Sequence, residues 1–201
     1  MEKKTFKDWE ESTREVLDAT WKFRDLCKKP FDRGFIGELL VLERLLKTYK
    51  SKLCTHDNGF IYVGSANKGW DISLTINNET KYINTKATSM ADGEGCPKWV
   101  RQDAKLFCEV KFDQKTEEQL VSPKKHLDNF FYIFVDVGSW LKNPKAKTIF
   151  YTLSDREAGN IFRKKYFKGH NKKVRKNKTT DFHVKYEDIK NRRDDNINRI
   201  F

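Results

Sequence analysis

The sequence predicts an α/β domain in which a mixed central β-sheet is flanked by helices. The first part of the chain carries apolar residues at helical spacing, whereas residues 59–88 break into short β-type runs. Residues 129–137 (Asn-Phe-Phe-Tyr-Ile-Phe-Val-Asp-Val) form the most apolar run, which is typical of a strand buried on both faces. Another strand is expected at residues 148–153, so helices precede and follow the strands.

Two amphipathic helices are expected first. Apolar residues recur at roughly helical spacing over residues 6–29, and Pro30 interrupts this pattern. A second helix is expected over residues 32–49, with a wide apolar face. Glu38 lies among these apolar residues, one turn after Gly34.

Short strands are expected next, at Gly59–Val63, Trp70–Ile76 and Thr80–Thr88. Residues 77–79 (Asn-Asn-Glu) read as a hairpin turn between the second and third of them. Residues 89–97 contain two Gly and a Pro and are expected to form a loop. A helix is expected over residues 98–120.

The C-terminal part is expected to be mainly helical. Ser154 with Glu157 at the third helical position forms a capping-box pattern, which predicts a helix that ends near residue 166. A basic loop, a short strand near residues 182–184 and a terminal helix over residues 186–199 are expected to follow.

No internal repeat or linker divides the chain, so a single domain is expected over residues 1–201. Its parts are an N-terminal helix (1–30), a core (31–153) and C-terminal helices with the basic loop (154–201). An aromatic content of 13% predicts a packed core, and a charged content of 35% predicts a heavily charged surface.

The formal net charge is +12, which predicts a polyanionic partner. Residues 158–180 contain no acid and nine basic residues, and such a run is best tolerated when it faces a phosphate backbone. These basic residues are Arg163, Lys164, Lys165, Lys168, Lys172, Lys173, Arg175, Lys176 and Lys178.

The four cysteines form no CxxC or CxxH pair, so a zinc site is not expected. The chain opens with Met-Glu-Lys-Lys and not with the apolar stretch of a signal peptide. No apolar run approaches membrane-spanning length. A cytoplasmic location without membrane contact is therefore expected.

The predicted hairpin carries an acid and a lysine that could meet. Asp71 lies near the start of its first strand, and Lys86 lies near the end of its second. A carboxylate that binds a divalent cation and a lysine that handles a water are the minimum for metal-assisted hydrolysis.

Over residues 31–153 the chain resembles the PD-(D/E)XK nuclease superfamily, which has the restriction-endonuclease-like fold. The resemblance is carried by Glu38 on the second helix, Asp71 in Gly-Trp-Asp, and Lys86 in Asn-Thr-Lys. It implies a catalytic core in which these residues and Asn84 act on a phosphodiester bond. It also implies a Mg²⁺ ion, for which Mn²⁺ can substitute, bound by Asp71, Asn84, the Thr85 carbonyl and Glu38.

Two positions depart from the family pattern. Trp70 replaces the proline of the motif, which is common variation. Asn84 replaces the acid of (D/E)-x-K, and its amide oxygen can coordinate Mg²⁺ but brings no charge. Metal binding would therefore depend more strongly on Asp71 and Glu38.

The resemblance implies a Mg²⁺-dependent endonuclease on double-stranded DNA, of the type II restriction class, that works as a homodimer. A structure-specific or repair nuclease of the same fold, and an inactive DNA-binding protein on that fold, are the alternatives. The expected DNA contacts are Trp99, Arg101, Gln102 and, in the basic run, Lys164, Lys165, Lys168, Lys172, Lys173, Arg175, Lys176 and Lys178.

Overall fold

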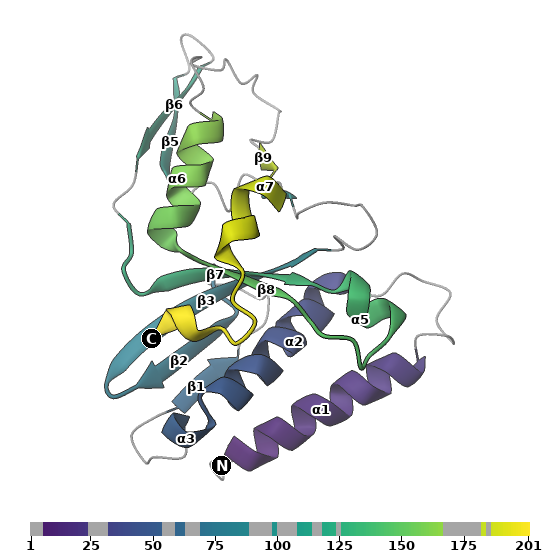
Figure 1. The fold of residues 1–201 in the computed structure, drawn as a ribbon. Coiled ribbons are helices and arrows are strands. Elements are labelled where there is room, and N and C mark those ends of the chain that lie inside the picture. Colours follow the sequence, from purple (N-terminus) through teal and green to yellow (C-terminus); the bar gives the residue numbers. More distant parts are fainter. Residues whose placement is uncertain are drawn as a thin grey trace.

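A computed structural model describes residues 6–23, 32–53, 59–62, 69–88, 98–99, 108–113, 118–123, 126–166, 182–183 and 186–201. Its centre is a five-stranded sheet in which β3 and β7 are parallel and the other neighbours are antiparallel (Figure 1). The prediction of a mixed central sheet is thus confirmed. In spatial order the strands are β1 (Gly59–Tyr62), β2 (Ile72–Ile76), β3 (Glu79–Thr88), β7 (Phe130–Asp136) and β8 (Phe150–Ser154).

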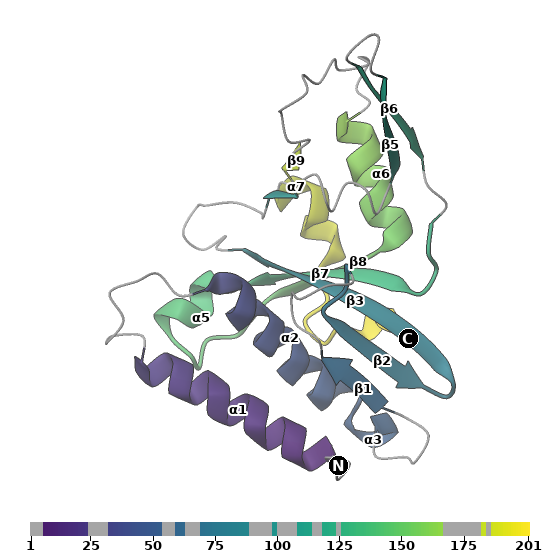
Figure 2. The same cartoon turned by 180° about the vertical axis from the view of Figure 1, so that it is seen from behind.

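Helices cover both faces of this sheet (Figures 1 and 2). One face carries α2 (Arg33–Thr48), and α1 (Phe6–Phe23) packs outside it. The other face carries α6 (Asp155–Tyr166), which packs on β7 and β8, and α7 (Tyr186–Ile189). The short helices are α3 (Lys50–Leu53), α5 (Gly138–Lys142), η3 (Lys190–Arg192) and η4 (Asn198–Ile200). None of the described helices combines the length and apolar character needed to cross a membrane.

The β2–β3 hairpin forms where the sequence predicts it. Asn77 (φ 51°) and Asn78 (φ 65°) both adopt the left-handed conformation of a two-residue hairpin turn, which asparagine tolerates better than most residues. The turn fixes the register, from Ile76 opposite Glu79 to Ile72 opposite Ile83.

The main core lies between the sheet and α2. Residues of β3 alternate between the two faces, so Ile83 and Ala87 lie on the α2 side, where Ile83 is fully buried. A Cβ atom at Gly37 of α2 would lie 2.9 Å from Ala87 Cβ and 3.0 Å from Val135 Cγ1. Glycine at this position therefore lets α2 approach β3 and β7 closely. All seven residues of β7 are buried, as predicted.

Helix α6 begins with the predicted capping box. Ser154 N donates to Glu157 Oε2 (2.9 Å), and Glu157 N donates to Ser154 Oγ (3.3 Å). These two bonds satisfy main-chain donors at the start of the helix that would otherwise lack a partner.

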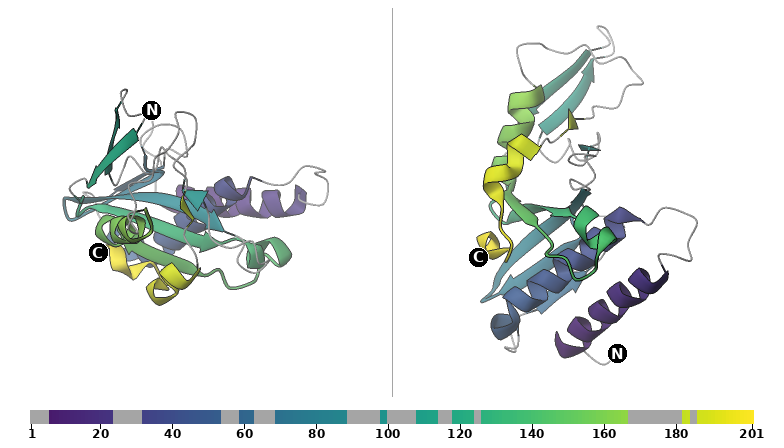
Figure 3. Two further views of the ribbon diagram at one scale, coloured as in Figure 1. Left: turned by 90° about the horizontal axis from the view of Figure 1, so that it is seen from above. Right: turned by 45° about the vertical axis from the view of Figure 1, so that its right-hand side comes forward.

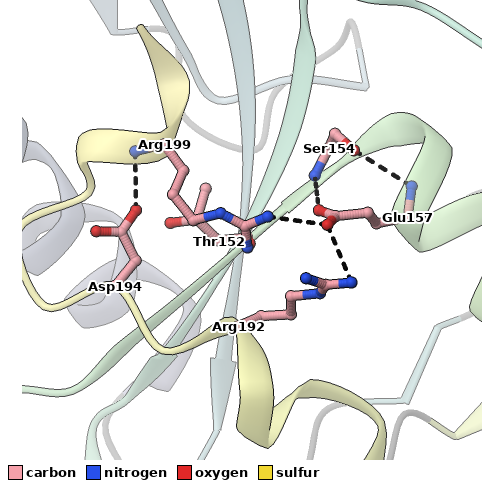
Figure 4. A network of polar contacts seen from close by, with 6 residues as sticks. All are labelled: Thr152, Ser154, Glu157, Arg192, Asp194 and Arg199. Atoms are coloured by element: carbon pink, nitrogen blue, oxygen red, sulfur yellow. Dashed lines mark hydrogen bonds and ion pairs between the residues drawn. The ribbon is translucent and has the colours of Figure 1, made fainter.

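The C-terminal segment is tied to β8 and α6 by a polar network (Figure 4). Arg199 donates to the Thr152 carbonyl (2.7 Å) and to Glu157 (2.9 Å), and Arg192 pairs with the same carboxylate at 3.2 Å. Asp194 accepts from the main-chain N–H groups of Asn198 and Arg199, both at 3.0 Å, and so caps η4.

Two predictions of secondary structure were wrong. Instead of a helix over residues 98–120, the chain forms β4 (Lys98–Trp99), β5 (Cys108–Asp113) and β6 (Glu118–Pro123). Apolar and charged residues alternate in Cys-Glu-Val-Lys-Phe-Asp, and this two-residue period favours the antiparallel pairing of β5 with β6.

The expected terminal helix is also interrupted, and only α7, η3 and η4 are helical. Asp194 N donates to the Phe150 carbonyl (2.8 Å), and Ile197 adopts φ 55°. Contacts with β8 therefore override the local helical pattern.

Candidate functional site

The candidate site lies where the β2–β3 ladder ends. β3 continues to Thr88 beside β7, whereas its pairing with β2 stops at Ile72 and Ile83. Asp71 N donates to the Ile83 carbonyl (2.8 Å), and Asp71 Oδ2 then accepts from Thr85 N at 2.6 Å. The buried Asp71 carboxylate thus takes the place of the main-chain carbonyl that a longer β2 would offer to Thr85 N.

The same hydrogen bond shows where the Thr85 carbonyl points. The N–H and C=O groups of a strand residue lie on the same side of the strand. Because Thr85 N–H points to Asp71, the Thr85 carbonyl lies on that side of β3 as well. The carboxylate of Asp71 and the main-chain oxygen of Thr85 are therefore both present at this edge, as the predicted metal site requires.

Asn84 places a buried acceptor beside them. Asn84 Nδ2 donates to the Gly69 carbonyl (3.0 Å), which fixes the orientation of the amide. The residue is only 6% exposed, and its Oδ1 atom has no hydrogen-bond partner among the described residues. Leaving a buried acceptor unpaired costs about 1–3 kcal/mol. Thr85 Oγ1 is buried and unpaired in the same way.

The close contact of α2 with the sheet brings Glu38 to the same part of β3. Gly37, the residue before it, touches Ala87, the residue after Lys86. Glu38 is only 8% exposed, so its carboxyl group is not an ordinary solvated helix carboxylate.

Lys86 is half-buried, near the end of β3. Strand alternation puts its side chain on the same face as that of Asn84, away from α2. The parallel register places Phe134 of β7 beside it. An apolar neighbour of this kind holds the stem of a lysine while leaving the charged group at the edge.

These groups fit a hard divalent cation, which prefers oxygen ligands from carboxylate, amide and main-chain carbonyl groups. In the part of the chain that the structure describes, no three His, Cys, Asp or Glu side chains are grouped to hold a metal. Asp71 is the acid that a hydrogen bond places at this edge, whereas Glu38 lies on α2, which packs on the face of β3 opposite to Asn84 and Lys86. A metal would therefore need the oxygens of Asn84 and Thr85 as well.

The predicted DNA contacts are only partly covered by the described residues. Lys164 and Lys165 lie in α6, and Trp99 lies in β4. β4 pairs with β9 (Phe182–His183), so the segment after the candidate site meets the segment after the basic run. The contacts outside the described residues are Arg101, Gln102, Lys168, Lys172, Lys173, Arg175, Lys176 and Lys178.

An aromatic pair beside the site was not predicted. The rings of Trp70 and Tyr82 lie 5.3 Å apart with an interplanar angle of 52°, and both are half-buried. Trp70 precedes Asp71, and Tyr82 lies two residues before Asn84. The sequence signal is the presence of aromatic residues at both positions, Trp70 before the acid and Tyr82 in the following strand.

A buried carboxyl group at the start of α6 was not predicted either. Asp155 is 2% exposed and accepts from Leu127 N (3.0 Å) and the Tyr132 hydroxyl (3.4 Å), with His126 Nδ1 at 3.6 Å. Burial raises the pKa of Asp155, although Leu127 N, His126 and Tyr132 oppose the rise. Tyr132 lies beside Asn84 in the sheet, so this cluster supports the strand next to the site.

Comparisons with protein-family models, with curated proteins and with solved structures found no match. The function proposed below therefore depends on the site and its sequence pattern.

Proposed function

We propose that this chain is a divalent-metal-dependent endonuclease that hydrolyses phosphodiester bonds in double-stranded DNA, on a restriction-endonuclease-like fold. The observation that carries the proposal is the buried Oδ1 atom of Asn84, which has no hydrogen-bond partner in the described part of the chain. It lies at the strand edge where the Asp71 carboxylate meets the Thr85 main chain. A cation bound there would give this acceptor a partner and remove the cost of leaving it unpaired.

The residues of the site would serve two purposes, which are coordination of the metal and orientation of the attacking water. Asp71, Asn84 Oδ1 and the Thr85 carbonyl would hold Mg²⁺ or Mn²⁺, and Glu38 would add a second negative charge. The bound cation supplies positive charge that stabilises the transition state and lowers the pKa of a water. The Lys86 ammonium would orient the attacking water and stabilise negative charge that develops on the phosphate.

The charge of the chain supports a nucleic-acid substrate. A net charge of +12 favours association with a polyanion, and the run over residues 163–178 supplies nine of the basic residues. Phosphate contacts of this kind hold a duplex in place but do not read its sequence. The type II restriction class, with a homodimer that cuts both strands, is the form of the activity that we propose.

An inactive DNA-binding protein is the second candidate, and Asn84 favours it. The amide brings no charge, and its Nδ2 atom has a purely structural bond to the Gly69 carbonyl. If the metal does not bind, the same fold and charge would serve only to hold DNA.

Plasmid cleavage in Mg²⁺ or Mn²⁺ separates the two candidates. Asp71→Asn and Lys86→Ala should abolish cleavage, because they remove the metal-binding charge and the water-orienting ammonium. Asp128→Asn and Lys145→Ala are matched controls on exposed side chains and should cleave normally. Intact DNA binding with no cleavage in either metal would refute the nuclease and favour the binding protein. Discrete fragments would support the restriction class.

A further inference from the structure

The aromatic pair of Trp70 and Tyr82 lies next to the candidate site, and neighbouring main-chain groups position it. Gly69 adopts φ 75°, a conformation that other residues rarely reach, and its carbonyl accepts the hydrogen bond from Asn84 Nδ2. On the other side, Tyr82 N donates to the Asn129 carbonyl (2.8 Å). Asn84, which we assign to the metal site, therefore also helps to position this pair.

The pair lies on the face of the sheet that carries Asn84 and Lys86. Tyr82, Asn84 and Lys86 follow each other at two-residue intervals on β3, so their side chains project from one face. The helices α1 and α2 cover the opposite face, and α6 packs on β7 and β8 (Figure 3). Trp70 and Tyr82 thus belong to the part of this face farther from α6.

The rings are neither fully buried nor isolated. Phe130 lies beside Tyr82 in the sheet and contacts Tyr132, with ring centroids 5.2 Å apart. Phe130 and Tyr132 are buried, whereas Trp70 and Tyr82 keep part of their surface in solvent. The aromatic row thus begins in the core and reaches the surface beside the candidate site.

We propose that Trp70 and Tyr82 form a stacking surface for one unpaired nucleobase of the DNA strand that occupies the site. Aromatic rings bind any base through its π-face, and the net charge of +12 favours binding of the adjoining phosphates. A base in a continuous duplex is already stacked on its neighbours, so the rings would take a nucleotide that is unpaired or is extruded from the duplex beside the bond to be cut. This inference rests on the proposed function, because it places the base relative to the nuclease site.

The test measures binding without metal, so that it does not depend on cleavage. Three oligonucleotides are compared by fluorescence anisotropy: a perfect duplex, the same duplex with one bulged 2-aminopurine, and the single strand containing that base. The wild-type chain should bind the bulged duplex about tenfold more tightly than the perfect duplex. The 2-aminopurine emission should fall on binding, because stacking on an aromatic ring quenches it.

Trp70→Ala and Tyr82→Ala should remove the preference and the quenching, while binding to the perfect duplex changes little. Trp70→Phe and Tyr82→Phe preserve a ring and should retain both, and they serve in place of an alanine variant that does not fold. Equal wild-type affinity for the bulged and perfect duplexes would overturn the inference, as would full preference in both folded alanine variants. Plasmid cleavage could still be observed in that case, and the proposed nuclease activity would then stand without the base-binding surface. Conversely, preference and quenching without cleavage would refute the nuclease but leave the base-binding surface in place.

Discussion

The carboxylate of Asp71 accepts a hydrogen bond of 2.6 Å from the main-chain N–H of Thr85. This bond both ends the pairing of β2 with β3 and orients the acid that we assign to the metal. The hairpin therefore gains part of its stability from a proposed catalytic residue.

Asp71→Ala should lower the free energy of unfolding by about 1–3 kcal/mol, since it leaves the buried Thr85 N–H without an acceptor. Urea unfolding without metal measures this change. Asp71→Asn keeps an acceptor oxygen and should cost less. Asp128→Asn, on a side chain that is 94% exposed, is the control and should stay within about 0.5 kcal/mol of wild type. An unchanged unfolding midpoint in Asp71→Ala would show that the bond contributes nothing to stability.

Asn84→Asp should increase the response of the chain to Mg²⁺. The new carboxylate adds a charge for the cation but loses the donated hydrogen bond to the Gly69 carbonyl. Without metal the variant should therefore be less stable, and Mg²⁺ should raise its melting temperature more than that of wild type. Thermal unfolding with and without Mg²⁺ measures both effects. Asn143→Asp, on an exposed turn, should show neither, and an identical Mg²⁺ response in all three chains would argue against a metal at Asn84.

Gly37→Ala should destabilise the contact of α2 with the sheet. Its Cβ atom would lie within 3.0 Å of Ala87 and Val135, and overpacking of this kind costs about 1–3 kcal/mol. The shift should also displace Glu38 and reduce cleavage. Gly34→Ala is the control, because its Cβ would meet only the Asp32 carboxylate at 3.1 Å. If Gly37→Ala were as stable as Gly34→Ala in urea, the close approach of α2 would not be required.

Glu157 should contribute stability that is lost in acid. Burial alone would raise its pKa, but the hydrogen bond from Ser154 N and the charges of Arg199 and Arg192 lower the pKa overall. Its contribution is therefore complete above the ordinary value of 4.5 and falls as the pH drops through the lower value of the folded state. Urea unfolding at pH 7, 5 and 3 should show the largest loss for Glu157→Gln at pH 7 and the smallest at pH 3. A loss that is equal at all three pH values would contradict the ionic origin of the effect.

Asp155 should have the opposite pH dependence, because burial raises its pKa. Ionising Asp155 destabilises the folded state. Its contribution to the free energy of unfolding therefore increases as the pH falls through the raised pKa toward the ordinary 3.8. Asp155→Asn should remove this dependence while its amide oxygen still accepts from Leu127 N. The wild-type chain should gain stability relative to the variant as the pH is lowered from 7 to 4. A relative loss over that range would mean that the hydrogen bonds outweigh burial.

Local patterns in the sequence predicted the parts of the fold that local forces determine. The two asparagines specify the hairpin turn, and Ser154 with Glu157 specifies the start of α6. The hairpin pattern also predicted that Asp71 and Lys86 could meet, and the resemblance to the nuclease superfamily added Asn84 and Thr85.

Features that depend on distant contacts could not be predicted in this way. Nothing in the sequence shows that Asn84 Nδ2 bonds the Gly69 carbonyl while Oδ1 finds no partner among the residues that the structure describes. The end of the terminal helix likewise depends on the bond from Asp194 N to Phe150, between residues 44 positions apart in the numbering. The pairing of β5 with β6 follows an alternating pattern that does not fit the helix predicted over residues 98–120.

The C-terminal network has a consequence for how a second molecule could join the sheet. The Phe150 carbonyl accepts from Asp194 N, and the Thr152 carbonyl accepts from Arg199, so both point away from β7 and both are occupied. A strand from another copy would find no free acceptor at these two positions of β8. The outer edge of β8 is therefore closed to such an extension at Phe150 and Thr152.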